Sequence, residues 1–183
     1  LADILVKNYG FKRVAFADPI RKLLYETNPA VKDGDYRLQG VVDGYGWDVA
    51  KTAFPEVRRL LQDLGVGARK VFGENFWVDR SLASIFEHEN AVITDVRFKN
   101  EIEYIQNNGG IVVRIKRGED PEWVDSLTKI NTQDKRIEYM EKFSIHQSEW
   151  DWVGCDFNYE IANNGTIEEL GNRVDSVLHS IGK

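Results

Sequence analysis

One short stretch decides the fold class: AVITDVRF, residues 91–98. Its first four residues form an apolar run of the length of a buried strand, and an acid follows directly at the end of the run. Strands without polar alternation are typical of parallel sheets whose two faces are both covered by helices. We therefore expect strands and helices to alternate on both sides of this stretch.

The rest of the chain fits this expectation. Strands are predicted at residues 14–17, 91–94, 111–115 and 157–161. Helices are predicted at residues 1–9, 18–28, 57–64, 76–86, 101–106 and 167–181, with a glycine-rich loop at residues 34–46. The alternation indicates an α/β fold in three layers, a parallel sheet flanked by helices.

Capping signals place several helix ends. Gly10 is expected to stop the first helix, and Asp18 before Pro19 is expected to cap the second. Thr166 with Glu169 three residues later predicts a capping box at the start of the last helix.

Composition limits the function classes. The chain has 183 residues, 42% hydrophobic and 30% charged, which suits a single domain, residues 1–183. Its net charge of -6 argues against general nucleic-acid binding, although a local arginine cluster can still bind a phosphate. Cys155 is the single cysteine, so we expect a buried thiol and a reducing, cytoplasmic compartment. No apolar run approaches 18 residues, so no membrane span is expected.

Charged residues follow the predicted strands. They are Asp18 after the first, Asp95 and Arg97 after the second, and Lys116 and Arg117 after the third. Because ligands of open α/β sheets bind at the carboxyl ends of the strands, these acids and bases predict a phosphate-plus-metal site. Asp95 is the candidate for a Mg²⁺ shell.

Five motifs occur in order along nearly the whole chain. They are FADPIR at residues 16–21, RRLLQ at 58–62, FGENFW at 72–77, ITDVRF at 93–98 and NNGTIEEL at 163–170. Together they resemble the phage-type deoxynucleoside monophosphate kinases, which have the adenylate-kinase-like P-loop fold. The family's strand order also implies that strand 91–95 does not pair directly with strand 111–115.

The resemblance implies a reaction and a setting. The γ-phosphoryl of ATP would pass to a deoxynucleoside 5′-monophosphate, with Mg²⁺, giving a deoxynucleoside diphosphate and ADP for deoxynucleotide metabolism. Residues 30–86 would bind the acceptor, and residues 117–150, ending in His146-Gln147-Ser148-Glu149, would form a mostly helical lid. The enzyme would work in the cytoplasm, that of the bacterial host if a phage encodes it, without nucleic-acid or membrane partners. Monomer and homodimer both stay open.

The resemblance also assigns roles to residues. Catalytic positions would be Asp18, Asp95, Arg97 and Arg117, and the acceptor nucleotide would contact Asp18, Arg21, Arg58, Arg59, Gln62, Trp77 and Glu149. The adenine of ATP would lie against Asn163 and Gly165. Arg58 or Arg59 would grip the acceptor phosphate, because a guanidinium can bind phosphate oxygens bidentately. Gln62 would read an edge of the base.

Each of these residues also has a plainer structural interpretation. Asp18 could be only a helix cap, and Asp95 could close an Asx turn or pair with Arg97. Surface positions would account for Arg21, Arg58, Arg59, Gln62 and the charges of the lid, and a core position would account for Trp77. Asn163 and Gly165 could form only a helix-capping loop.

Two departures from the family pattern affect these expectations. The family has a first strand and a Gly-rich, lysine-containing phosphate loop before the helix that opens at Leu1, and the sequence does not show them. A chain that begins at Leu1 is therefore expected to lack the cradle for the donor phosphates and to be inactive. The stretch from Leu64 to Gly67 also lacks the threonine and acid that follow this glycine in the family. Either residues are missing there or the turn is shorter, and the family's substrate contacts near residue 66 are not carried over.

Two other functions stay open. One is a related small-molecule kinase, of the dephospho-coenzyme A kinase kind, whose last Asn-x-Gly turn is similar. The other is a protein that binds nucleotides without catalysis.

Overall fold

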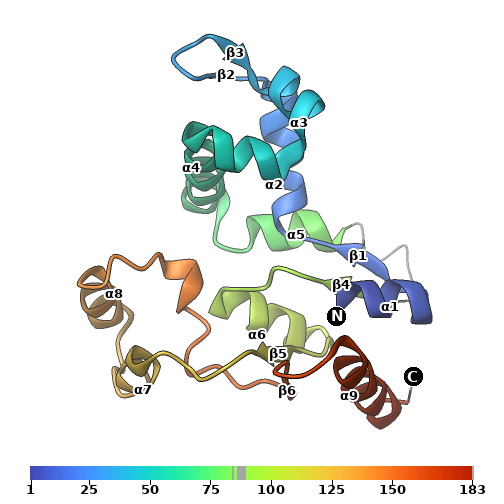
Figure 1. The fold of residues 1–183 in the computed structure, drawn as a ribbon. Helices are drawn as coiled ribbons and strands as arrows, with labels where there is room; N and C mark the ends of the chain where they lie inside the picture. Colours follow the sequence, from blue (N-terminus) through green and yellow to red (C-terminus); the bar gives the residue numbers. More distant parts are fainter. Residues whose placement is uncertain (84, 86–89, 183) are drawn as a thin grey trace. The chain divides into compact units, whose positions relative to one another are not determined.

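The computed structural model describes residues 1–83, 85 and 90–182 (Figure 1). The chain divides into two compact units. One unit spans Lys12–Asp95, and the other combines Leu1–Phe11 with Val96–Lys183.

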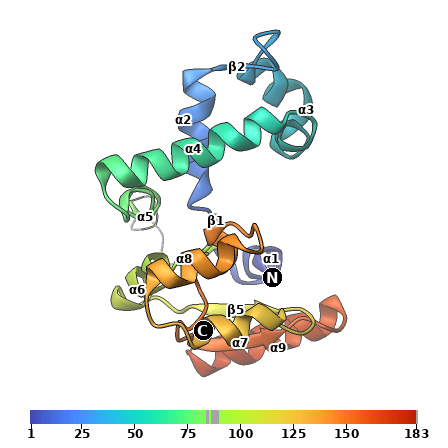
Figure 2. The ribbon, with the colours of Figure 1, turned by 90° about the vertical axis from the view of Figure 1, so that its left-hand side faces the viewer.

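The Lys12–Asp95 unit contains a short parallel strand pair and a group of helices. Strand β1 (Lys12–Val14) pairs with β4 (Ala91–Ile93), so that Lys12 lies opposite Ala91 and Val14 opposite Ile93. The helices are α2 (Ala17–Thr27), α3 (Leu38–Ala53), α4 (Pro55–Phe72) and α5 (Phe76–Leu82), and α4 crosses α2 (Figure 2). A small antiparallel pair, β2 (Ala30–Val31) and β3 (Tyr36–Arg37), joins α2 to α3.

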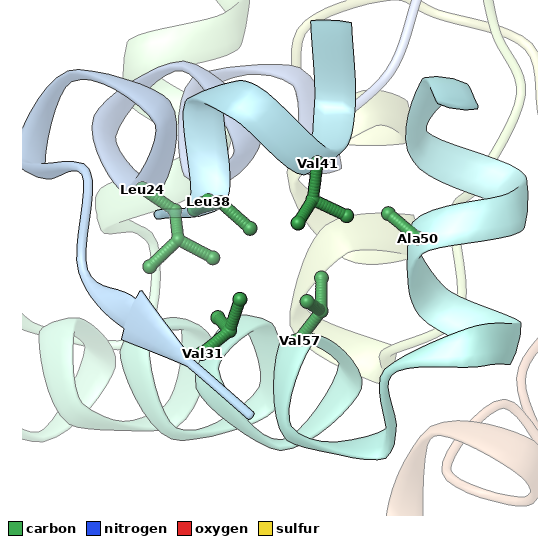
Figure 3. Packing of buried hydrophobic residues seen from close by; sticks show 6 residues of the cluster. All are labelled: Leu24, Val31, Leu38, Val41, Ala50 and Val57. Carbon is green, nitrogen blue, oxygen red and sulfur yellow. The ribbon is translucent and has the colours of Figure 1, made fainter. Parts of the chain in front are cut away.

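An apolar cluster holds the helices of this unit together. It consists of Leu24, Val31, Leu38, Val41, Ala50 and Val57, which point toward one another from α2, β2, α3 and α4 (Figure 3). Burying an aliphatic side chain is worth about 1.5–3 kcal/mol. Burial thus overrides the weak helix propensity of the glycines in α3.

The predicted glycine-rich loop at residues 34–46 is therefore partly wrong. Residues 38–46 belong to α3, and only Gly34 lies in the hairpin between β2 and β3. The helix does break at Gly46, where φ is 75° and ψ is 164°. That conformation is open to glycine and strained for other residues.

The second unit contains the other parallel pair. Strand β5 (Val113–Lys116) pairs with β6 (Tyr159–Ala162), from Val113 opposite Tyr159 to Lys116 opposite Ala162. Its helices are α1 (Ala2–Tyr9), α6 (Lys99–Asn107), α7 (Glu122–Thr128), α8 (Gln133–Glu141), the short 3₁₀ helix η1 (Gln147–Glu149) and α9 (Ile167–Ser180). Helix α9 packs beside β6.

Most predicted elements are confirmed, with shifted ends. Gly10 ends α1 in the left-handed conformation, and Thr166 and Glu169 form the predicted capping box of α9. The first strand was predicted too late: it ends at Val14, and Ala15 and Phe16 are buried in the turn that leads into α2.

Three further corrections concern helices. Phe16 and not Asp18 is the N-cap of α2, so Asp18 lies in the first turn. Helix α4 continues through the turn predicted near Gly65. Helix α5 ends at Leu82, and the predicted end at Phe86 lies outside the described residues.

The structure is mixed α/β with short parallel strand pairs, which is compatible with a kinase-like fold. Within the described residues, the parallel strand pairs are β1 with β4 and β5 with β6, and the separation of strand 91–95 from strand 111–115 stays a prediction. A three-layer P-loop sheet stays a prediction. No helix in the described part of the chain is long and apolar enough to cross a membrane.

The cluster in Figure 3 makes a stability prediction for α3. Val41 is 2% exposed and Val49, on the same helix, is 49% exposed. Val41→Ala should lower the free energy of unfolding by about 1–3 kcal/mol through lost burial and a cavity. Val49→Ala makes the same chemical change and should shift it by less than about 0.5 kcal/mol. Urea unfolding followed by circular dichroism measures both, and equal losses would contradict the packing.

Candidate functional site

The carboxylate of Asp95 binds the turn that precedes α2. The N–H of Phe16 donates to its Oδ1 at 2.8 Å, and the N–H of Ala17 donates to its Oδ2 at 2.9 Å. Thr94 N–H donates to the carbonyl of Val14 at 3.1 Å and so continues the strand pair up to this point. The acid therefore caps a helix that starts 78 residues before it. Both oxygens of Asp95 thus accept from the turn before α2, and a pairing with Arg97 stays a prediction.

Asp18 adds a second carboxylate to the same turn. Its Oδ2 accepts from the N–H of Ala15 at 3.2 Å, and its Oδ1 lies 3.2 Å from Nη1 of Arg21. Three successive N–H groups, from Ala15 to Ala17, thus face the two acids. Because β1 and β4 are parallel, this turn lies at the carboxyl end of the pair, where the predicted site belongs.

Helix α3 contributes a further pair of charged residues, Asp48 and Lys51. The hydrogen bond and the charge of Lys51, together with the charge of Arg21, lower the pKa of Asp48. Lys51 Nζ lies 2.9 Å from Asp48 Oδ1. Lys51 also lines a hollow of about 290 Å³ with Thr52, Pro55 and Arg58. No sequence pattern singles out Lys51, which stands one turn before Pro55.

Helix α4 presents a polar stripe beside α2. Arg58, Gln62, Gly65 and Arg69 recur at helical spacing and share one face. A Cβ at Gly65 would lie 3.5 Å from Cδ1 of Ile20, so this face meets α2 there. Arg58 and Gln62 therefore lie on the face of α4 that meets α2 at Gly65.

The structure separates Arg58 from Arg59. Nη1 of Arg59 lies 2.8 Å from Oδ2 of Asp63, and its Nη2 lies 3.6 Å from Oε1 of Glu56, so both partners are acids of its own helix. Arg58 has no such partner among the residues that the structure describes. Arg58 is the guanidinium that is open to an added anion.

Trp77 has a structural role in the fold. Its side chain is 2% exposed, and its Nε1–H donates to the carbonyl of Gly65 at 2.9 Å. The neighbouring Phe76 ring packs edge-on against it at 4.8 Å. The indole thus joins α5 to α4, and little of its surface is left for a base.

In the second unit, Arg97 pairs with Glu149. Its Nη1 lies 2.6 Å from Glu149 Oε1, and both side chains are exposed. The buried carboxylate of Asp151 accepts from the N–H of Lys99 at 2.9 Å and from the amides of Gln133 and Gln147 at 2.7 and 2.9 Å. No sequence signal marks Asp151, because most of its partners are distant in the chain.

The basic residues in β5 and directly after it differ in their surroundings. Arg114 pairs with Asp120 and with Glu160, and its guanidinium lies 4.5 Å above the ring of Trp152. Burial would raise the pKa of Asp120, but Lys116 and Arg114 outweigh it and lower that pKa. Arg117 is exposed and has no ion-pair partner in the described part of the chain.

The turn between β6 and α9 is shaped by its capping box. Oε2 of Glu169 accepts from the N–H of Thr166 at 3.1 Å. A Cβ at Gly165 would overlap that carboxylate, so a larger residue there would have to displace the Glu169 side chain from the capping box. Asn163 donates its N–H to the carbonyl of Lys116 at 2.7 Å, and Asn164 accepts from the N–H of Gly118. These contacts explain the turn without a ligand.

Residues 117–150 are mostly helical, as predicted, but they are not merely a polar flap. Val124, Leu127, Met140, Trp150 and Val153 form a buried cluster of their own. Arg136 donates to the carbonyls of Ile130 and Val153, each at 2.9 Å. Its guanidinium is thus bound by one backbone carbonyl of this segment and by one just after it.

Two other features bear on chemistry. Cys155 is partly buried and not fully buried as predicted, and this burial raises the pKa of its thiol, which disfavours the reactive thiolate. Among the described residues no group of three or more His, Cys, Asp and Glu side chains is placed to hold a metal ion.

Comparisons with known proteins bear on the class of protein. No protein-family model matches the chain. A protein of Acanthamoeba polyphaga mimivirus, described as "Putative deoxynucleotide monophosphate kinase", is 26% identical over 191 residues, which cover 97% of this chain and 88% of that protein. The similarity thus runs over nearly the whole length of both chains and agrees with a kinase family at this coarse level.

The Asp95 contacts can be tested by stability. Asp95→Asn keeps the size but turns an NH₂ group toward one of the two backbone donors. The free energy of unfolding should fall by about 1–3 kcal/mol, because one N–H loses its acceptor. Asp63→Asn, at an exposed acid of α4, is the matched control and should change it by about 0.5 kcal/mol or less. Denaturant titration at neutral pH compares them, and equal effects would show that Asp95 does not hold α2.

Proposed function

We propose that the protein transfers the γ-phosphoryl of ATP to a deoxynucleoside 5′-monophosphate. The observation that carries this proposal is the arrangement of charges in the Lys12–Asp95 unit. Two carboxylates lie on the turn at the carboxyl end of β1 and β4, and Arg58 faces a hollow beside Lys51 without an acidic partner among the described residues. The viral relative, whose printed name is that of a deoxynucleotide monophosphate kinase, supports the same reaction class.

The acceptor phosphate is assigned to Arg58 and Lys51. A guanidinium binds two phosphate oxygens in one plane, and an ammonium adds a point charge. The hollow of about 290 Å³ between them is large enough for a phosphate group. Gln62, one turn beyond Arg58 on the same face, would contact the base. Residues 30–86 are in this proposal the acceptor-binding region.

Arg21 contributes to orientation. Its guanidinium pairs with Asp18, and its charge helps to lower the pKa of Asp48, the acid partner of Lys51. An acceptor that is already a phosphate anion needs no strong general base. Catalysis would be positioning and neutralisation of charge.

Magnesium fits the carboxylates of this unit. Mg²⁺ is usually held by one or two carboxylates together with substrate phosphates. Each oxygen of Asp95 accepts one N–H and keeps a second lone pair, and Asp18 is half-exposed on the same turn. We assign the ion to Asp95, with Asp18 near it, and its chemistry would be neutralisation of charge on the transferred phosphoryl group.

The candidates in the second unit are assigned to the donor side. Arg97 and Arg117 are exposed cations that could neutralise phosphate charge, and Asn163 and Gly165 would lie near the adenine. Residues 117–150 would act as the lid, which excludes water from the reaction.

Arg58 and Arg59 provide a matched pair for a test. Arg58→Ala should weaken binding of a deoxynucleoside monophosphate by about 10- to 150-fold, since a charge-assisted hydrogen bond contributes about 1.5–3 kcal/mol. Arg59→Ala should change it by less than about threefold, because Glu56 and Asp63 already neutralise that guanidinium. ATP affinity should stay the same in both variants.

Isothermal titration calorimetry with each of the four deoxynucleoside monophosphates measures these affinities. The assignment of the acceptor phosphate to Arg58 is wrong if the two variants behave alike, or if ATP binding falls as far as monophosphate binding.

A further inference from the structure

Two segments of the second unit lie side by side at the ends of α6 and η1. Asp151 accepts a hydrogen bond from the N–H of Lys99 at 2.9 Å. Two residues earlier in both segments, Arg97 and Glu149 form their ion pair at 2.6 Å. The backbone contact and the ion pair thus join the same two stretches of chain.

The backbones of both segments are fixed without the ion pair. Glu101, which is 2% exposed, accepts from the N–H groups of Arg97 and Phe98 at 2.8 and 3.1 Å. Asp151, also buried, accepts from Lys99 and from two glutamine amides. The Arg97–Glu149 pair is therefore not needed to hold the segments together.

The ion pair is open to exchange. The side chains of Arg97 and Glu149 are 53% and 57% exposed. Exposed ion pairs contribute little to stability, so a competing anion can replace Glu149 at small cost. A phosphate group carries more charge than a carboxylate and can engage the guanidinium bidentately.

We propose that Glu149 is a specificity-determining residue which occupies Arg97 as an internal anion until a phosphate group of a nucleotide replaces it. The inference rests on the proposed function, in which Arg97 binds nucleotide phosphate. It changes the role predicted for Glu149 from a contact with the substrate to a competitor of the substrate. Singly charged anions that bind weakly leave the Arg97–Glu149 ion pair intact, and a di- or polyphosphate displaces Glu149 from Arg97.

Arg114 provides the contrast. Its side chain is 19% exposed, two acids bind it and Trp152 covers its guanidinium. Glu160, one of these acids, is about half-exposed and pairs with Arg114 at 2.8 Å. Glu160→Gln removes the same charge from the same unit at an arginine that is already held by Asp120. It is the matched control for Glu149→Gln.

Calorimetric titration with inorganic pyrophosphate tests the exchange. Glu149→Gln should bind pyrophosphate about fivefold more tightly than the natural protein, whereas Glu160→Gln should differ by less than about twofold. The gain should disappear in the double variant Arg97→Gln, Glu149→Gln. Thermal unfolding midpoints of the Glu149→Gln variant and the natural protein should agree within about 2 °C, which shows that the gain is not a change in folding.

Each other outcome counts against the proposal. Equal gains in Glu149→Gln and Glu160→Gln would show only a general charge effect. Weaker binding in Glu149→Gln would make Glu149 a ligand contact, and no pyrophosphate binding in any variant would remove the exchange altogether. The Arg58 result is independent of these, because it concerns monophosphate binding in the Lys12–Asp95 unit.

Discussion

The carboxylate of Asp95 is the constraint on which the Lys12–Asp95 unit depends most. The pair of β1 and β4 is three residues long, and the N-cap of α2, Phe16, has no side chain that can accept a hydrogen bond. Asp95 supplies that acceptor from the end of β4 and so fixes where α2 starts. The positions of Asp18 and Arg21 in the first turns of α2 follow from it. So does the contact of Ile20 with α4.

Some basic side chains of this unit have acidic partners and Arg58 has none, and this difference points to function. Arg59 and Arg21 have acidic partners one turn away, and Lys51 has Asp48. Arg58, beside Lys51, has no acidic partner among the described residues. A phosphate could therefore bind its guanidinium without first displacing a carboxylate. In the second unit the candidate arginine, Arg97, is instead paired with an exposed glutamate. The protein would thus bind one phosphate without competition and another by exchange.

Local signals allowed much of the fold to be predicted from the sequence. The apolar stripe of α4 and the capping box of α9 involve residues within one or two turns, and both are confirmed. Helix α3 was missed because its glycines favour a loop locally, whereas burial of Leu38 and Val41 decides the outcome. Strand β1 was placed too late because Lys12 and Arg13 are exposed and polar, and the apolar residues after them belong to the turn.

The site was harder to predict, because its contacts join residues far apart in the chain. Asp95 meets the turn before α2 across 78 residues, and Arg97 meets Glu149 across 52. The sequence marked these charged residues as candidates but could not distinguish a helix cap from a ligand. It also could not show that Arg136 is used by backbone carbonyls, or that Arg59 is neutralised by acids of its own helix.

Phosphoryl transfer itself tests the central claim most directly. The complete natural chain would be mixed with Mg²⁺, ATP labelled at the γ-phosphate, and each deoxynucleoside monophosphate in turn, and the labelled products separated by chromatography. We expect label in a deoxynucleoside diphosphate, with at least one of the four acceptors and at a rate near the usual kinase range of about 1–100 per second. Three results would contradict the assignment: label only in inorganic phosphate, label only in the coenzyme A formed when dephospho-coenzyme A is offered as a rival acceptor, or label in no product despite nucleotide binding.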